Sequence, residues 1–293
     1  MEESRIQWFP GHMARTRRRI KENLSLVDAV CEIVDARIPF SSRNPDLNSI
    51  IGGKPRLIIL NKADLADENA TKEWIKCYSK DGCRVMTADS KKGIGVKQFI
   101  PEIKILLKDK LERYRQKGMR GKMLRVMIVG IPNVGKSSFI NKLAGRSAKV
   151  EDRPGVTRGN QWFSLGGGVE VMDTPGVLWP KFDDATVGEM LAFTGAVKDT
   201  IIDIEHLALR LIGTLMPTYE ENICVRFKVE PDKDVLHMLE KIAVRRGMLI
   251  KGGEPDIERA SVMFLDEFRA GRLGRITLEL PQKATDCVSD IKV

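Results

Sequence analysis

Residues 130–137 read GIPNVGKS, and this stretch decides the fold of the chain. Its Gly-x-x-x-x-Gly-Lys-Ser pattern is typical of a loop that binds the phosphates of a nucleotide. The apolar run Leu124–Val129 before it predicts a strand, and Ser137–Ala144 after it predicts a helix that ends at Gly145. In that arrangement, backbone N–H groups converge on phosphate at the N-terminus of the helix. The sequence therefore predicts a strand, a phosphate loop and a helix in succession.

The phosphate loop offers side chains for both a nucleotide and a metal ion. We expect Lys136 to reach the β- and γ-phosphates and the Ser137 hydroxyl to coordinate Mg²⁺. We also count Lys136 among the catalytic residues. The other residues of the loop that we expect to bind the nucleotide are Asn133, Val134, Gly135 and Ser138.

A base-reading motif, NKAD at residues 61–64, lies about 70 residues before the phosphate loop and follows the apolar run 57–60. The Asp64 carboxylate can accept hydrogen bonds from N1–H and N2–H₂ of guanine, whereas adenine has no matching pair of donors. We expect Asn61 and Lys62 to support the base and the phosphate loop. A helix cap in a surface loop is the alternative interpretation of this motif taken alone. Beside a phosphate loop, the motif predicts GTP and GDP as ligands.

Two further segments are candidates for sensing the terminal phosphate. DTPG at residues 173–176 ends a predicted strand, so Asp173 can contact Mg²⁺ through water and the N–H of Gly176 can meet the γ-phosphate. Between this motif and the phosphate loop lies PGVT at residues 154–157. We expect Thr157 to close over Mg²⁺ and the γ-phosphate, and we count it as both a metal ligand and a catalytic residue.

A third contact to the base is predicted in the loop TADSK at residues 87–91, which follows a predicted strand. Its N–H groups are expected to approach O6 of guanine. The usual Ser-Ala pair is not cleanly present, and we assign the contact to Ser90.

The order of predicted elements indicates an α/β domain followed by a helical domain. Strands that alternate with helices imply a mostly parallel sheet covered on both faces. After about residue 185 the predicted elements are helices, so we expect an α/β domain at 1–182 and a separate helical domain at 183–293. The predicted strands are Val27–Val34, Arg56–Leu60, Arg84–Thr87, Leu124–Val129, Trp162–Leu165 and Val169–Met172. The predicted helices are Thr71–Lys80, Val96–Lys117, Ser137–Ala144, Ile204–Met216, Lys233–Arg246 and Glu254–Ala270.

Composition excludes several classes of protein. The chain has 293 residues, of which 42% are hydrophobic and 30% charged, as in a globular protein with a full core. No apolar stretch approaches the roughly 18 residues of a transmembrane helix. The N-terminus shows no targeting pattern, and five cysteines without a C-x-x-C pair predict a reducing compartment with neither disulfides nor zinc. We therefore expect a cytoplasmic protein.

The net charge of +9 is unevenly distributed. The first 180 residues carry the whole basic excess, and the remainder is slightly acidic. Two segments, 15–21 and 104–125, are densely basic, and such segments attract polyphosphate. Solvated helix faces are the alternative interpretation of each. The candidates for contacts with RNA phosphates are residues 15–21, Arg269, Arg272 and Arg275.

With the base-reading motif before the phosphate loop, the chain resembles the circularly permuted GTPases, because most GTPases have these motifs in the reverse order. Within that group it resembles the ribosome biogenesis GTPase A family, and the resemblance covers nearly the whole chain. The resemblance implies a P-loop GTPase domain at 1–182 and a helical C-terminal domain at 183–293 that docks to RNA or the ribosome. The stretches that carry the resemblance are IQWFPGHM at 6–13, DARIP at 35–39, SSRNP at 41–45, DRPGVT at 152–157 and FRAGRLGRI at 268–276.

The resemblance also bears on the hydrolytic step. Ras-like enzymes place Gln directly after the D-x-x-G motif, whereas this chain has Val177, which cannot orient water. The sequence holds only three histidines, at positions 12, 206 and 237. The resemblance implies that His12 is the substitute catalytic residue, although a lone histidine is more often structural. It also implies that Asn133 helps to hold K⁺ beside the phosphates.

The activity implied by the resemblance is assembly of the large (50S) ribosomal subunit. The partners would be a precursor of that subunit and its rRNA; hydrolysis would be stimulated by the ribosome and would trigger release. Two alternatives remain open at this point: a nucleotide-gated RNA-binding scaffold with negligible turnover, and a regulatory GTPase with a protein partner.

Overall fold

The computed structural model describes residue 18 and residues 20–119, 121–145, 150–151, 161–174, 185–197 and 203–281. These residues divide into two compact units. The helical unit contains the described residues from 185 to 278, and the α/β unit contains those up to 174 together with 279–281. The domain boundary predicted at residue 182 lies outside the described residues.

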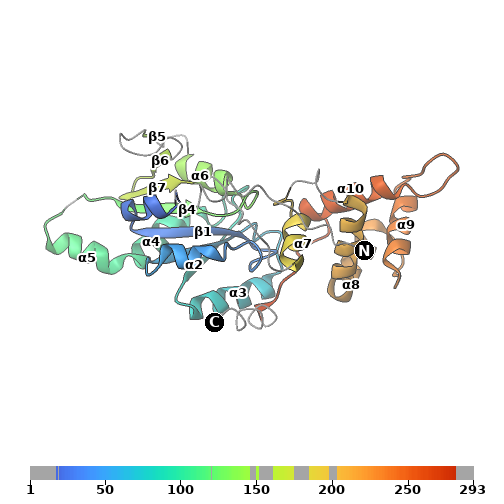
Figure 1. Cartoon of the computed structure of the whole chain (residues 1–293), viewed down its shortest axis with the longest axis horizontal. Coiled ribbons are helices and arrows are strands. Elements are labelled where there is room, and N and C mark those ends of the chain that lie inside the picture. The colour runs from blue at the N-terminus through green and yellow to red at the C-terminus, as the bar shows by residue number, and fades with distance from the viewer. Residues whose placement is uncertain are drawn as a thin grey trace. The chain divides into compact units, whose positions relative to one another are not determined.

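The described part of the α/β unit is built on one seven-stranded sheet with the order β3-β2-β1-β4-β7-β6-β5 (Figure 1). Strands β3, β2, β1, β4 and β7 are parallel, whereas β7, β6 and β5 pair in antiparallel fashion. The predicted fold class is therefore confirmed. The strands are β1 (Ala29–Asp35), β2 (Arg56–Asn61), β3 (Arg84–Ala88), β4 (Leu124–Val129), β5 (Val150–Glu151), β6 (Gln161–Ser164) and β7 (Val169–Asp173). The helices of this unit are α2 (Asp46–Ile51), α3 (Glu68–Lys80), α4 (Phe99–Leu106), α5 (Lys108–Gln116) and α6 (Lys136–Ala144), with 3₁₀ turns at Leu24–Leu26 and Val96–Gln98.

The central strand β1 is buried along its whole length, as expected for a parallel strand with both faces covered. Val30 and Val34 share one face of the pleat, because side chains alternate along a strand. Val30 packs with Leu47 of α2, and Val34 packs with Trp74 and Tyr78 of α3. Helices α2 and α3 thus cover this face. Helix α4 packs against β2 and β3 and meets α6 through an edge-to-face contact of Phe99 with Phe139, whose ring centroids lie 5.6 Å apart.

The long helix predicted over Val96–Lys117 is wrong, because the structure divides it. A 3₁₀ turn and α4 precede Leu107, whose backbone angles (φ −107°, ψ 23°) are not helical, and α5 begins at the next residue. Leu107 is buried, whereas no residue of α5 is. The helical spacing of apolar residues in the sequence therefore continues into α5, although the chain leaves the core after Leu107.

Residues 279–281 return to the α/β unit. The Glu279 carboxylate accepts hydrogen bonds from the backbone N–H groups of Phe40 (2.7 Å) and Ser41 (3.1 Å) and from the Ser41 hydroxyl. The carbonyl oxygen of Glu279 accepts a further bond from Nε1 of Trp74 at 2.8 Å. Phe40 and Ser41, which donate these bonds, directly follow the DARIP stretch (residues 35–39) that begins at the end of β1.

The helical unit contains α7 (Ala185–Phe193), α8 (Ile204–Phe227), α9 (Val235–Arg245) and α10 (Ile257–Arg269). Asp203, Asp234 and Asp256 cap three of these helices, each accepting a bond of 2.9–3.0 Å from the backbone N–H three residues later. The stacked rings of Phe227 and Phe264 join α8 to α10 at a centroid distance of 5.6 Å.

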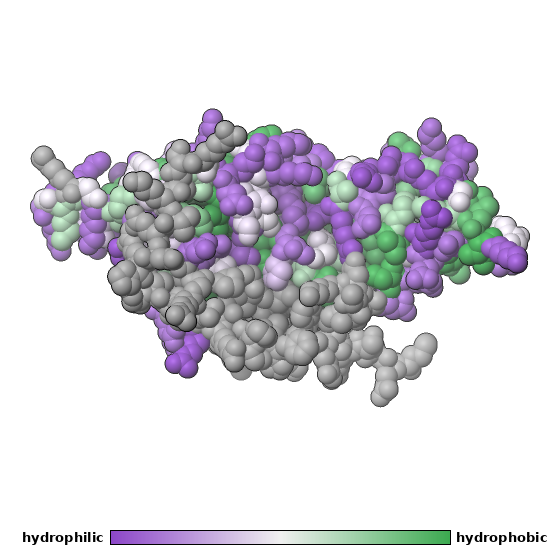
Figure 2. Space-filling model, turned by 90° about the horizontal axis from the view of Figure 1, so that it is seen from above, coloured by the Kyte–Doolittle hydropathy of each residue, from purple (hydrophilic) through white to green (hydrophobic). Residues whose placement is uncertain are grey.

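Helix α8 extends eleven residues beyond its predicted end at Met216. The helix contains Pro217 and kinks nearby, with non-helical angles at Tyr219. Ile223 and Phe227 of the second half are buried, and this packing stabilises the helix beyond the kink. Hydrophobic patches (green) are visible among the hydrophilic surface of the helical unit at the right of Figure 2. Exposed apolar residues of this unit are Val225, Leu236, Val244, Leu249, Ile250 and Val262.

Candidate functional site

The predicted ligand-binding motifs meet at one edge of the sheet. Strand β2 ends at Asn61, β4 ends at Val129 just before the phosphate loop, and β7 ends at Asp173. Because these strands are parallel and lie side by side with β1, their carboxyl ends form a common edge. Ligands of open α/β sheets bind at this edge.

Asn61 joins three of the predicted segments. Its Nδ2 donates to the carbonyl oxygen of Val134 in the phosphate loop at 2.6 Å. Its Oδ1 accepts from the backbone N–H of Ser90 at 3.1 Å and from the Ser90 hydroxyl at 2.6 Å. Asn61 and Ser90 are both buried. The base-reading motif, the phosphate loop and the TADSK loop are therefore held together in the predicted neighbourhood, although Ser90 directs its donors to Asn61.

Two glycines permit the close approach of the phosphate loop to its neighbours. Gly135 has φ 94°, and a Cβ at this position would lie 2.4 Å from Nδ2 of Asn61. Gly130 has φ 157°, and a Cβ there would lie 2.5 Å from the carbonyl oxygen of Ile33 in β1. Asn133 and Lys62 adopt the left-handed region without being glycine, with φ of 60° and 58°. Non-glycine residues in this region are uncommon and are enriched at ligand sites.

A buried carboxylate at the end of β1 positions Lys62. Asp35 Oδ2 accepts from Lys62 Nζ at 2.8 Å and from Arg37 Nη2 at 2.8 Å, and Oδ1 accepts from Arg37 Nε at 3.0 Å. Burial acts to raise the pKa of Asp35, but the charges of Arg37 and Lys62 outweigh it and hold the pKa well below its usual range. The sequence did not reveal this role. The sequence feature that could have revealed it is the position of Asp35 directly after a predicted apolar strand. No function was assigned to the DARIP stretch that begins with this residue.

Asp64 is partly exposed beside this cluster. Its Oδ2 accepts from Nζ of Lys92 at 3.3 Å, and a quarter of its side chain (26%) is accessible. The carboxylate can therefore be reached by a base. The sequence did not single out Lys92.

Lys136 is the first residue of α6 and is buried beneath the phosphate loop. Its Nζ donates to the carbonyl oxygen of Ile131 at 3.0 Å. Burial lowers the pKa of Lys136 to about 8, against the opposing charge of Asp173. Phosphate oxygens carried into the loop would restore the full charge of this ammonium group.

Asp173 fits the predicted place beside a metal ion. Burial raises its pKa, although Lys136 and a backbone hydrogen bond from Thr174 act in the opposite direction. Its Oδ1 is buried and has no hydrogen-bond partner among the described residues. An orphaned carboxylate oxygen next to the phosphate loop suits a water of hydrated Mg²⁺. Ser137 is exposed at the start of α6, so its hydroxyl is accessible for direct coordination.

Several predicted residues lie outside the described part of the chain: His12, Thr157 and Gly176, together with Val177. The other two histidines do not belong to the nucleotide site. His206 and His237 are exposed residues at the starts of α8 and α9, where their backbone N–H groups bond to the capping aspartates. His237 Nδ1 also lies 2.8 Å from Asp232.

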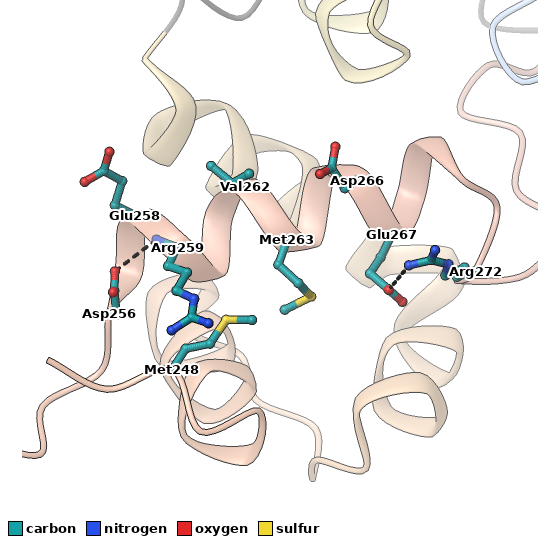
Figure 3. A pocket seen from close by; sticks show the side chains of 9 residues that line it. All are labelled: Met248, Asp256, Glu258, Arg259, Val262, Met263, Asp266, Glu267 and Arg272. Carbon is teal, nitrogen blue, oxygen red and sulfur yellow. Dashed lines mark hydrogen bonds and ion pairs between the residues drawn. The ribbon is translucent and has the colours of Figure 1, made fainter.

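A cavity of about 490 Å³ lies in the helical unit and is distinct from the predicted nucleotide site (Figure 3). Its lining holds more carboxylates than cations, and Arg272 within it is paired with Glu267 at 2.7 Å. Such a lining is unsuited to nucleotide phosphates. The residues around it are Met248, Asp256, Glu258, Arg259, Val262, Met263, Asp266, Glu267 and Arg272.

The described ranges also bear on membrane and metal binding. None of their helices is both long and apolar enough to cross a bilayer. In the same ranges, no three side chains of His, Cys, Asp or Glu gather as a metal site. Cys31, Cys77, Cys83 and Cys224 are free thiols.

Comparison with known proteins agrees with this site. A family model described as "50S ribosome-binding GTPase" matches residues 125–241. The chain is 44% identical to ribosome biogenesis GTPase A of Bacillus cereus, over 98% of each protein, and 37% identical to that of Thermotoga maritima, over 96% of each. A crystal structure of GNP-bound YlqF from T. maritima is similar at a TM-score of 0.63 and 34% identity, covering 92% of this chain and 99% of that one.

These relatives match over nearly the whole chain. Proteins of this kind bind guanine nucleotides and, typically, Mg²⁺. The chain is therefore a GTPase and belongs to the ribosome biogenesis GTPase A family.

Proposed function

We propose that this GTPase assists late maturation of the large ribosomal subunit and leaves the particle when it hydrolyses GTP. The observation that carries the proposal is the 2.6 Å bond from Asn61 to Val134, because it unites a guanine-specific motif with a phosphate loop in one site. The name of the matching family model and those of the relatives support a ribosomal partner. The protein would bind a late precursor in its GTP state, and the ribosome would stimulate hydrolysis. Because hydrolysis is irreversible, this cycle would give assembly a direction.

Within this site, Asp64 reads guanine, Lys136 binds the β- and γ-phosphates, and Ser137 coordinates Mg²⁺ with Asp173 acting through water. The backbone from Asn133 to Ser138 cradles the phosphates, and Thr157 and Gly176 sense the γ-phosphate. His12 supplies the catalytic group that Val177 cannot, and Asn133 helps to hold K⁺. The orphaned Oδ1 of Asp173 and the burial of Lys136 support the first part of this assignment.

The test is GTP turnover measured with purified ribosomal subunits added one at a time. We expect low basal turnover, a large stimulation by large subunits and none by small subunits. Binding to large-subunit precursors should be stronger with a non-hydrolysable GTP analogue than with GDP. Equal stimulation by both subunits, or binding that ignores the nucleotide, would refute the proposal. Rates compared in K⁺ and in Na⁺ test the role of Asn133, since equal rates would exclude a bound K⁺.

A second candidate function is an RNA-binding scaffold gated by nucleotide with negligible turnover, and it is favoured by Val177 in the position of the water-orienting residue. Multiple-turnover assays separate the two. A scaffold would hydrolyse at most one GTP per particle, whereas the assembly factor would cycle repeatedly when precursor is in excess.

A further inference from the structure

Helix α5 leaves the core of the α/β unit. None of its nine residues is buried, although α4 before it and β4 after it are firmly packed. An isolated helix of this length is marginal in water, so stability normally comes from a packed face. Here the contacts are few. Lys110 forms an ion pair with Asp28, and the Tyr114 ring lies between Nζ of Lys110 (5.7 Å) and Nζ of Lys122 (4.6 Å).

The exposed surface of α5 and the turn after it carries unneutralised positive charge. Lys108, Arg113 and Lys117 are exposed, and no acidic side chain of the described residues pairs with them. Arg115 is 3.5 Å from Glu112 in an exposed pair, which neutralises little. Such a surface attracts polyanions over a distance of about a Debye length.

This surface lies away from the nucleotide. Lys110 is tied to Asp28, which directly precedes β1, and the chain after α5 leads into the first residue of β4. Both points mark the amino ends of parallel strands, whereas Asn61 and Asp173 mark their carboxyl ends. Figure 1 shows α5 at the far left of the α/β unit. The positive charge of α5 therefore lies at the end of the sheet opposite the bound nucleotide.

The arginines first expected to contact RNA in the helical unit are otherwise engaged. Arg269 donates from Nε to the carbonyl oxygen of Phe193 (3.1 Å) and from Nη2 to that of Ala192 (2.9 Å). Arg272 is paired with Glu267 beside a cavity rich in carboxylates. Arg269 therefore stabilises the helical unit, and the charge of Arg272 is partly cancelled by Glu267.

We infer that α5 is the surface on which this protein docks to the sugar-phosphate backbone of rRNA, through Lys108, Arg113 and Lys117. The inference rests on the proposed function and names one of its contacts. A protein partner is disfavoured because protein interfaces centre on apolar and aromatic anchors, and the one aromatic residue of α5, Tyr114, is held between two lysines. Contacts to phosphate fix position without reading sequence.

The test is the charge reversal Lys108→Glu, Arg113→Glu and Lys117→Glu in one variant of the full chain. None of these side chains is buried, so the fold should persist, and GDP affinity and basal GTPase activity should equal those of the wild type. Binding to purified large-subunit rRNA is measured between 50 and 200 mM salt. Each lost phosphate contact lowers the magnitude of the slope of log K against log salt by about 0.7–0.9, so the three together should lower it by about 2.1–2.7.

A matched control applies the same change in charge to the helical unit: Lys233→Glu, Arg245→Glu and Lys251→Glu. These residues are also exposed. We expect the control to keep most of the salt slope, because loss of net charge alone does not remove a docking surface. Equal losses in the two variants would overturn the inference, as would a wild-type slope in the α5 variant.

Binding measured separately to large-subunit precursors and to purified rRNA distinguishes failure of this inference from failure of the proposed function. If the α5 variant loses rRNA binding while the wild type fails to bind large-subunit precursors, the proposed function falls and the RNA surface stands. If α5 reversal abolishes binding to precursors but leaves binding to rRNA intact, the partner of α5 is an acidic protein, and the inference is overturned.

Discussion

Nδ2 of Asn61 donates a 2.6 Å hydrogen bond to the carbonyl oxygen of Val134, a residue 73 positions later in the chain. The same side chain accepts two hydrogen bonds from Ser90. One amide group thus sets the separation between the part of the site that reads the base and the part that binds phosphates. A shared ligand needs that separation to be fixed, whatever the order of the motifs along the chain.

Asn61→Ala should weaken both the fold and nucleotide binding. It leaves the buried carbonyl of Val134 and the N–H of Ser90 unpaired, which costs about 1–3 kcal/mol of unfolding free energy. GDP affinity should fall by roughly tenfold or more, since 1.4 kcal/mol corresponds to tenfold. Urea unfolding and titration of a fluorescent GDP measure the two effects. Asn222→Ala is the control, because it removes a comparable 2.8 Å bond to Leu273 in the helical unit, and it should spare GDP affinity.

Asp64→Asn should exchange guanine specificity for xanthine specificity. The amide cannot accept from both N1–H and N2–H₂ of guanine, whereas it can donate to the 2-oxo group of xanthine. GTP affinity should fall on the order of 10⁴-fold. Competition binding with GTP and XTP measures the change. Asp81→Asn, at an exposed position after α3, should alter neither affinity; unchanged preference for GTP in the Asp64 variant would remove Asp64 from the base site.

Nucleotide binding should take up a proton above pH 8. The pKa of Lys136 is about 8 in the free protein because the side chain is buried. Phosphates raise it, so binding requires protonation once the free lysine is neutral, and affinity falls as the pH rises through 8. The number of protons taken up should be larger at pH 8.5 than at pH 7. Calorimetry in two buffers of different ionisation enthalpy gives the number directly. Equal uptake at both pH values would contradict the assignment.

Asp35→Ala should destabilise the α/β unit by about 3–5 kcal/mol, because it removes the partner of two cations, one of them buried. The folded pKa of Asp35 is depressed, so its contribution is present above the unfolded value near 3.8 and is lost as the pH falls toward the folded value. The difference in unfolding free energy between wild type and variant should therefore be constant from about pH 7 to about pH 5 and begin to shrink below about pH 4. A difference that grows with acid would show that the carboxylate is not held ionised.

His12→Ala should leave GTP affinity unchanged and reduce ribosome-stimulated turnover by roughly 10²- to 10⁴-fold, as expected for loss of a general acid–base or water-orienting group. His206→Ala and His237→Ala are controls, because both residues lie at helix starts in the helical unit. Stimulated turnover that survives the change at position 12 would assign the catalytic role elsewhere.

Short sequence motifs predicted the location of the nucleotide site more accurately than the spacing of apolar residues predicted the ends of the helices. The phosphate loop and the NKAD motif are local patterns whose chemistry fixes their place at the ends of strands. Asp35 was missed because its role depends on Lys62, a partner 27 positions away that no local pattern reveals. The break at Leu107 was missed because apolar spacing continues into α5, and the end of α8 was misplaced because packing overrides Pro217. Helix α7 is apolar over most of its surface, so no amphipathic stripe marked it.

The anchorage of Glu279 makes the helical unit an insertion and not an appendage. Its chain departs after β7 and comes back at residues 279–281, which belong to the α/β unit. A domain joined to the rest of a protein by one linker can adopt many orientations. A domain joined at both of its ends can adopt far fewer. If the chain were cleaved only on the N-terminal side of α7, the hydrogen bonds of Glu279 would still hold the helical unit to the α/β unit.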